Sequence, residues 1–187
     1  MENKTWTIDT THSAISFSVR HMVVAKVRGR FASWTSKVQL NPADLTRSRV
    51  EVEIDANSID TGVADRDNHL RSPDFFDVAR FPALRFASTK VEKVSGERYR
   101  LHGDITIRDV TKPITLEVEY GGQGKDPWGN QRVAFSATTS VSRSEFGLKW
   151  NQALEAGGVL VGDRIEIEIE VQAVQVAATQ TAQQASA

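Results

Sequence analysis

Hydrophobic and polar residues alternate with a period of two along much of this chain. In residues 49–56, Val50 and Ile54 alternate with Glu51 and Glu53. A strand places such apolar side chains on one face and the carboxylates on the other, whereas a helix would spread the charges around its circumference. We therefore predict a strand whose apolar positions are buried and whose glutamates are exposed.

The same pattern recurs at intervals, with short links between the patterned segments. Strong alternation covers residues 13–20, 49–56, 99–108, 114–120, 133–141 and 164–171, and weaker alternation covers 31–40 and 83–92. The links 94–97 and 109–113 are short, and 121–129 is rich in glycine. Such links join antiparallel neighbours, because parallel strands need long crossovers. The pattern thus predicts about eight antiparallel strands.

An all-β protein with one apolar face per strand has two good architectures. One is a closed antiparallel barrel, and the other is a sandwich of two sheets. An eight-stranded barrel has room inside for side chains or for one small ligand. Periodicity does not decide between the two.

Three regions lack strand character, and the last of them sets the end of the predicted domain. Residues 61–76 could hold a short helix, and 145–158 form another irregular excursion. The C-terminal residues are rich in alanine and glutamine and carry no charge, and the strand pattern fades after Val171. We expect a barrel domain over 1–174 and a disordered tail over 175–187, with a short alanine-rich helix as the alternative for the tail.

Composition excludes several classes of protein. Apolar residues make up 40% of the 187 residues, and 23 Lys and Arg against 24 Asp and Glu give a formal net charge of −1. This balance argues against a partner that is nucleic acid bound through its phosphates. The absence of cysteine excludes disulfides and thiolate metal ligands. No apolar run has the length of a signal peptide or membrane span, so we expect a cytoplasmic protein without stable membrane insertion, with leaderless export left open.

The histidines give little support for catalysis. They are His12, His21, His69 and His102, and no two of them have metal-ligand spacing, so we expect no metal site. Asp65 and His69, like Asp67 and Arg71, are four residues apart, so on a helix each pair would share a face. No nucleophile motif or phosphate-binding glycine loop accompanies them, and we expect no enzyme and no catalytic residues. A small-molecule enzyme that uses these residues with His12 or His21 remains the alternative.

Aromatic residues point instead to an apolar interior. The chain has eight Phe, four Trp and two Tyr. Phe75 and Phe76 are adjacent on an irregular segment, and one of these rings could plug a barrel end. Bulky rings from loops and strands suit the lining of an apolar cavity, although any single ring suits a packed core equally well.

The order of several short motifs resembles one known family, the YceI-like proteins. The motifs are Trp6-Thr-Ile-Asp with His12-Ser, Gly29-Arg-Phe, Ser58-Ile-Asp-Thr, Arg66-Asp-Asn-His-Leu-Arg-Ser, Asp74-Phe-Phe-Asp with Phe81-Pro, Gly103-Asp-Ile-Thr-Ile-Arg-Asp-Val-Thr-Lys-Pro, Ser142-Arg-Ser-Glu-Phe-Gly-Leu with Trp150, and Val161-Gly-Asp. Together they extend from about Trp6 to Val171, nearly the whole chain. Each is weak alone, and their order makes the resemblance specific.

The resemblance implies a lipocalin-like, eight-stranded antiparallel barrel with one or two short helices. It also implies a long-chain ligand inside, such as a polyisoprenoid, a quinone or a fatty-acid derivative, held for transport, storage or sequestration. Members of the family are often homodimers, so a homodimer is a possible partner arrangement. Many carry a signal peptide; we expect none here, because the N-terminal residues contain no apolar run of that length. No cofactor other than the bound lipid is expected.

We predict that the lipid contacts are apolar side chains that face inward. They are Phe17, Val19, Phe31, Ile105, Ile107, Leu116 and Phe135, with Phe75, Phe76, Phe146 and Trp150 near the barrel ends. Besides the enzyme, a second alternative is a structural or stress-response module whose core is filled. The volume of the interior separates that module from a lipid carrier.

Overall fold

The computed structural model describes residues 4–22, 24–155 and 157–177. In these residues the strands are β1 (Lys4–Ile8), β2 (Ala14–His21), β3 (Ala25–Phe31), β4 (Trp34–Gln39), β5 (Arg49–Asp55), β6 (Ile59–Asp60), β7 (Ala83–Ser95), β8 (Arg98–Ile107), β9 (Val110–Lys125), β10 (Gln131–Ser142) and β11 (Val161–Ala177). The helix is α1 (Ala64–Arg71), and the 3₁₀ turns are η1 (Thr10–His12), η2 (Leu45–Arg47), η3 (Ala56–Ser58) and η4 (Arg143–Phe146).

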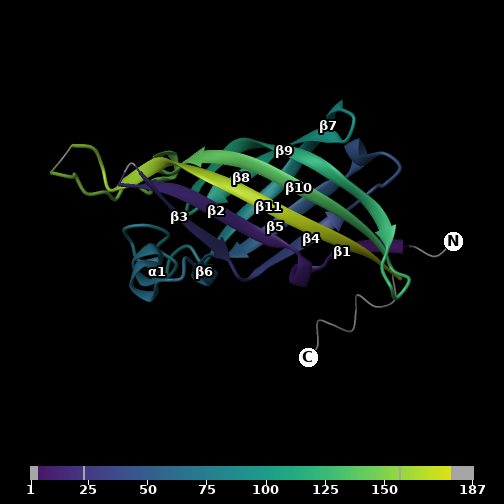
Figure 1. Cartoon of the computed structure of the whole chain (residues 1–187), viewed down its shortest axis with the longest axis horizontal. Helices are drawn as coiled ribbons and strands as arrows, with labels where there is room; N and C mark the ends of the chain where they lie inside the picture. Colours follow the sequence, from purple (N-terminus) through teal and green to yellow (C-terminus); the bar gives the residue numbers. More distant parts are fainter. Residues whose placement is uncertain (1–3, 23, 156, 178–187) are drawn as a thin grey trace.

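All strands belong to one curled antiparallel sheet, with the order β4-β5-β7-β8-β9-β10-β11-β2-β3-β6 (Figure 1). Two long strands are bent and interrupted: β1 and β2 together form one, and β3 and β4 together form the other. β1 and β2 both pair with β11, one after the other along its length, while β3 pairs with β2 and β4 pairs with β5. If each bent pair is taken as one strand, about eight long strands surround the interior, which matches the predicted barrel.

The sheet curls into a half-barrel and does not close with a continuous ladder. Cα atoms of β1 and β4 come within 8 Å of each other, yet the described residues contain no ladder between these two strands. The all-β, antiparallel fold class is confirmed, and α1 lies within the segment predicted to hold a helix. One continuous sheet excludes the alternative of two separate sheets.

Several boundaries differ from the prediction because pairing partners far along the chain decide them. β11 continues to Ala177, and residues 175–177 pair with β1, so the predicted tail begins too early. The remainder of the predicted tail, 178–187, lies outside the described residues. β9 already begins at Val110, inside the predicted link 109–113, because it pairs with Ile107 of β8.

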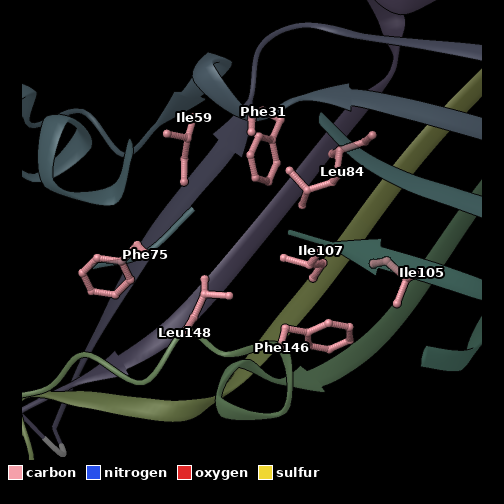
Figure 2. Packing of buried hydrophobic residues seen from close by; sticks show 10 residues of the cluster. Phe31, Ile59, Phe75, Leu84, Ile105, Ile107, Phe146 and Leu148 are labelled. Carbon is pink, nitrogen blue, oxygen red and sulfur yellow. The ribbon is translucent and has the colours of Figure 1, made fainter. Parts of the chain in front are cut away.

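Buried side chains gather in two clusters near opposite ends of the barrel. We call the larger one the plug; its buried members are Ile15, Phe31, Ala56, Ile59, Phe75, Leu84, Ile105, Ile107, Phe146 and Leu148. Figure 2 shows them converging from strands, from the turn after α1 and from η4. The far cluster consists of Trp6, Val133 and Ala173, with Ile8, Leu40, Tyr120 and Phe135 packed against it.

Candidate functional site

The inner face of the barrel between the two clusters is apolar but only half-buried. We call it the half-buried inner face; its residues are Val50, Ala137, Ile165 and Ile167, which belong to neither cluster, whereas the half-buried Val52, Val141 and Ile169 pack against the plug. The sequence predicted buried apolar positions here, and the faces are correct: Glu51, Glu53 and Glu168 are exposed on the opposite side. These apolar side chains are half-buried, however, whereas the sequence predicted them to be fully buried. A side chain on the inner face keeps accessible surface only where protein atoms do not fill the space in front of it.

Two glycines allow phenyl rings to lie close against the barrel wall. Gly29 on β3 faces Phe17 on β2, and a Cβ placed on Gly29 would lie 2.5 Å from the ring. Gly103 on β8 is related in the same way to Phe86 on β7, where the distance would be 2.4 Å. Any larger residue at these positions would push the ring away from the wall. The glycines therefore help to keep interior space free of aromatic bulk.

The hydroxyl groups on the inner face are bonded to the main chain. The Ser88 Oγ accepts a hydrogen bond from the Val50 N–H at 2.9 Å, where the β5–β7 ladder ends. The Thr139 Oγ1 donates to the Thr115 carbonyl at 2.8 Å, beyond the last β9–β10 pair. Each hydroxyl thus stands in for a missing ladder bond, and the surrounding surface offers mainly apolar contacts.

The structure places the predicted lipid contacts in several different surroundings. Phe31, Phe75, Ile105, Ile107 and Phe146 are buried members of the plug, and Phe17, Phe76 and Trp150 pack against it. Phe135 packs against the far cluster. Val19 and Leu116 belong to neither cluster; Leu116 is buried and Val19 is half-buried. None of the residues of the half-buried inner face is in that predicted set.

α1 and the turn after it cover the plug. His69, in the last turn of α1, lies edge-on between the rings of Phe75 and Trp150, with centroids 5.0 and 4.6 Å away. Its Nε2 is 2.8 Å from the Asp74 carboxylate. Arg71 donates to the Ile59 carbonyl at 2.9 Å, which ties the helix to β6. These polar groups therefore hold the plug in place.

The charge pairs expected from four-residue spacing are replaced by other contacts. Asp67 is buried and accepts hydrogen bonds from the N–H and hydroxyl of Thr61, so it does not pair with Arg71. His69 pairs with Asp74, and Asp65 is exposed. Short-range bonds to the main chain after β6 take precedence over helix-face pairing, because they satisfy donors that burial would otherwise leave unpaired.

Arg143 fixes the long loop that crosses the plug end. Its guanidinium is buried and donates to four main-chain carbonyls, at distances of 2.7 to 3.3 Å. They are the carbonyls of Leu148, Trp150, Val161 and Gly162. Burial lowers the pKa of Arg143 below its usual value, while the nearby Asp163 opposes that shift. An arginine beside a serine gave no hint of this role in the sequence.

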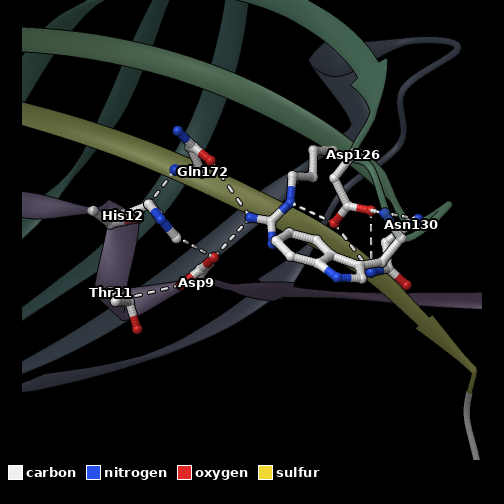
Figure 3. Close-up of polar contacts among 9 residues, drawn as sticks. Asp9, Thr11, His12, Asp126, Asn130 and Gln172 are labelled. Carbon is white, nitrogen blue, oxygen red and sulfur yellow. Dashed lines mark hydrogen bonds and ion pairs between the residues drawn. The ribbon is translucent and has the colours of Figure 1, made fainter.

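A network of charged side chains on the outer surface connects the segments around the far cluster, and we call it the far-end network (Figure 3). Arg132 on β10 donates to Asp9 at 2.7 Å and to Asp126 at 2.9 Å. The hydrogen bond from Arg132 is the main reason that the pKa of Asp9 lies well below its ordinary value. Burial alone would raise the pKa of Asp126, but hydrogen bonds from Asn130 and Arg132 outweigh it and lower the pKa to about 2. The network joins β1, β10 and the β9–β10 hairpin.

The histidines do not come together into a reactive centre. His12 bonds to Asp9 in the far-end network, His69 bonds to Asp74 at the plug, and His102 bonds to Thr115 on β9. Among the described residues no group of three or more His, Asp or Glu side chains is placed to hold a metal ion. The arrangement of polar groups stabilises the ends of the barrel, and the inner face between them supplies apolar surface. No helix in the described ranges is long and apolar enough to cross a membrane.

A curled antiparallel sheet with an apolar, half-buried inner face defines a barrel-like class of protein. The YceI-like domain family matches residues 6–173. The chain therefore belongs to the YceI-like family, as the sequence motifs indicated.

Relatives and solved structures agree with this membership. A UPF0312 protein from Shewanella denitrificans is 37% identical over 168 residues, which cover 88% of this chain and 85% of the relative. The crystal structure of a Campylobacter jejuni YCEI protein is 30% identical, with a TM-score of 0.72, and the match covers 83% of this chain and 88% of that one. A polyisoprenoid binding domain from Saccharophagus degradans has the same fold, with a TM-score of 0.65 at 13% identity, over 90% of this chain and 97% of that domain.

Proposed function

We propose that the half-buried inner face lines a chamber that binds one long-chain apolar lipid, such as a polyisoprenoid, a quinone or a fatty-acid derivative. The observation that carries the proposal is the partial exposure of inward isoleucines and valines that belong to neither packed cluster. Family membership supports it, as does the shared fold of a domain described as polyisoprenoid binding. The protein would act by sequestering or carrying the lipid, without a covalent step.

The driving force is transfer of the chain from water to an apolar wall. Each buried CH₂ contributes about 0.8 kcal/mol, so a chain of about ten carbons supplies enough to exceed the cost of association. Bound lipid would remove the accessible surface that Ile165, Ile167 and Ile169 keep. The small residue Ala137, opposite Ile169 on the neighbouring strand, adds room for the chain.

Native mass spectrometry of the protein purified from its own host tests this proposal. We expect one lipid of long-chain mass per binding unit, released on denaturation and identified after extraction. A matched sample of the Ala137→Trp variant should carry less lipid, because the indole would occupy the chamber. Protein that carries no lipid, and takes up none from mixed lipid vesicles, would instead favour the filled structural module.

The enzyme alternative has no observation in its favour. It requires His69 to meet His12 or His21, whereas His69 bonds to Asp74 at the plug, His12 bonds to Asp9 in the far-end network, and the described residues show no hydrogen bond between His21 and His69. We therefore propose a binding protein rather than an enzyme. As the sequence led us to expect, we also propose that it works in the cytoplasm.

A further inference from the structure

The turn of the β2–β3 hairpin exposes large apolar side chains to solvent. Val24 exposes 83% of its surface and Met22 exposes 49%. The Met22 N–H donates to the Leu160 carbonyl at 2.9 Å, which places the turn beside the loop that precedes β11. That loop contributes Val159, which is 46% exposed. The hairpin and the loop project from the end of the molecule that carries α1 (Figure 1). We call Met22, Val24 and Val159 the apolar tip.

The backbone of the turn does not require these residues. Met22 has a φ of 50°, a left-handed conformation that glycine or asparagine adopts at lower cost in a hairpin turn. The Val24 N–H donates to the Met22 carbonyl at 2.8 Å, and this main-chain bond needs no particular side chain. Large apolar side chains are also unfavourable in water. Their grouping on two adjacent projecting loops therefore indicates contact with an apolar surface outside the protein.

The same hairpin is basic. Residues 20–30 include four basic residues and no acidic one; the basic residues are Arg20, Lys26, Arg28 and Arg30. Lys26 pairs with a glutamate on β11 at 2.8 Å, and Arg30 pairs with an aspartate on β6 at 3.2 Å. Arg20 and Arg28 are exposed and form no ion pair within the part of the chain that the structure describes. The hairpin therefore keeps positive charge beside the apolar tip.

The neighbouring loop does not cancel this charge. Residues 147–160 carry one basic and one acidic residue, Lys149 and Glu155, which offset each other. The three side chains of the apolar tip offer roughly a few hundred Å² of surface, whereas a stable protein complex covers about 800 Å² on each partner. An anionic bilayer needs no such area, because apolar side chains enter its interface while arginines meet lipid phosphates. Charge and area thus favour a membrane surface over a second protein.

We propose that the β2–β3 hairpin, together with Val159, docks the protein reversibly on a membrane surface that contains anionic lipid. The apolar tip enters the interfacial layer, and Arg20 and Arg28 contact the lipid phosphates. Loop tips make the contact, so docking needs no element that spans the bilayer. The plug end then faces the membrane and the far end stays in water. Docking is independent of the proposed chamber, since vesicle binding is measured whether or not the barrel holds a lipid.

The absence of cysteine allows a single probe to be placed at either end of the molecule. Val24→Cys carries the environment-sensitive dye NBD at the apolar tip. Val94→Cys, the matched control, carries it at the β7–β8 hairpin of the opposite end, where the valine is also exposed. Each labelled protein is mixed with vesicles of equal parts phosphatidylcholine and phosphatidylglycerol, and separately with vesicles of phosphatidylcholine alone.

We expect the anionic vesicles to shift the emission of the Val24→Cys label to shorter wavelength and to raise its intensity, with no change at Val94→Cys. No shift at either position, or the same shift at both, overturns the proposal. A shift at Val24→Cys that grows with protein concentration without vesicles identifies a second copy as the occupant and also overturns it. Unlabelled Val24→Asp should lower the affinity for anionic vesicles about tenfold, whereas Val94→Asp should not change it.

The charged contribution is tested with two double variants that remove the same charge. Arg20→Gln with Arg28→Gln should lower the affinity for anionic vesicles about tenfold in co-sedimentation, because two contacts with lipid phosphates are lost. Arg49→Gln with Arg98→Gln removes two exposed arginines from the opposite end and should have little effect. Thermal midpoints of all variants show that they remain folded. Equal losses in both double variants would mean that net charge alone governs binding, and the hairpin would not be the docking site."

Discussion

The plug and the half-buried inner face are built from the same residue types on neighbouring stretches of the same strands. In the plug, Phe146 and Ile59 are almost completely buried, because α1 and η4 fold over the barrel and bring additional side chains onto the sheet. Ile167 and Val50 belong to neither cluster, and these side chains stay half-buried. The difference shows that burial here depends on what the connections supply, since the strand pattern is equally apolar in both regions.

The largest effect should come from truncation in the plug. Phe146→Ala leaves a cavity among side chains that cannot collapse into it, and we expect a loss of about 3–5 kcal/mol in the free energy of unfolding. Urea denaturation with an unchanged m-value measures this loss. A cost below about 1.5 kcal/mol would place Phe146 in the same class as the half-buried residues and remove the contrast.

The loop across the plug should depend on Arg143. Arg143→Met removes the donor shared by four carbonyls, and we expect a destabilisation of about 3 kcal/mol, since buried acceptors would lose their partners. Arg143→Lys keeps the charge but cannot reach all four carbonyls, so its cost should be intermediate. Limited proteolysis between residues 147 and 160 should become faster in the same order. Equal stability of all three proteins would show that the loop is held by other contacts.

Truncation of the half-buried inner face should separate stability from binding. Ile167→Ala removes surface that is only partly buried, so we expect a stability loss of about 1 kcal/mol without ligand. Affinity for cis-parinaric acid, a fluorescent long-chain fatty acid, should fall several-fold, because the lipid loses wall contacts. Thermal unfolding and fluorescence titration of the same sample measure the two effects. A large loss of stability together with unchanged affinity would mean that Ile167 is part of a filled core.

The smallest effect concerns the far end at low pH. The pKa values of Asp9 and Asp126 are lower in the folded protein than the ordinary carboxyl value of about 4. Their contribution to stability is therefore complete above about pH 4 and is lost as the pH falls toward about 2. Asp126→Asn should make that loss shallower, as followed by the thermal midpoint between pH 6 and pH 2. Identical slopes for both proteins would contradict the role of this network.

Alternation in the sequence predicted most of the barrel, because a strand with one apolar face reveals itself over a few neighbouring residues. It identified β5, β8 and β10 and which of their side chains face inward. It missed β1, where Trp6 and Ile8 alternate with threonines over too few residues to stand out, and which depends on pairing with the distant β11. Strands of this kind are decided by contacts far apart in the chain, which local patterning does not show.

The candidate site was predicted less well than the fold. The aromatic residues drew attention because rings are bulky, yet Phe75 and Phe146 turn out to belong to the plug. The residues that keep accessible surface are ordinary valines and isoleucines, and their pattern is the same whether the space in front of them is filled or empty.

The most direct test of a chamber compares the same bulky substitution in the two regions. Ala137→Trp lies on the half-buried inner face and Ile107→Trp lies in the plug. For each delipidated variant we would measure the thermal midpoint and the binding of cis-parinaric acid. The account predicts that Ala137→Trp loses binding with an unchanged or higher midpoint, while Ile107→Trp loses about 1–3 kcal/mol from overpacking. If Ala137→Trp is destabilised as much as Ile107→Trp and the parent protein binds no probe, the interior is filled and the account is contradicted.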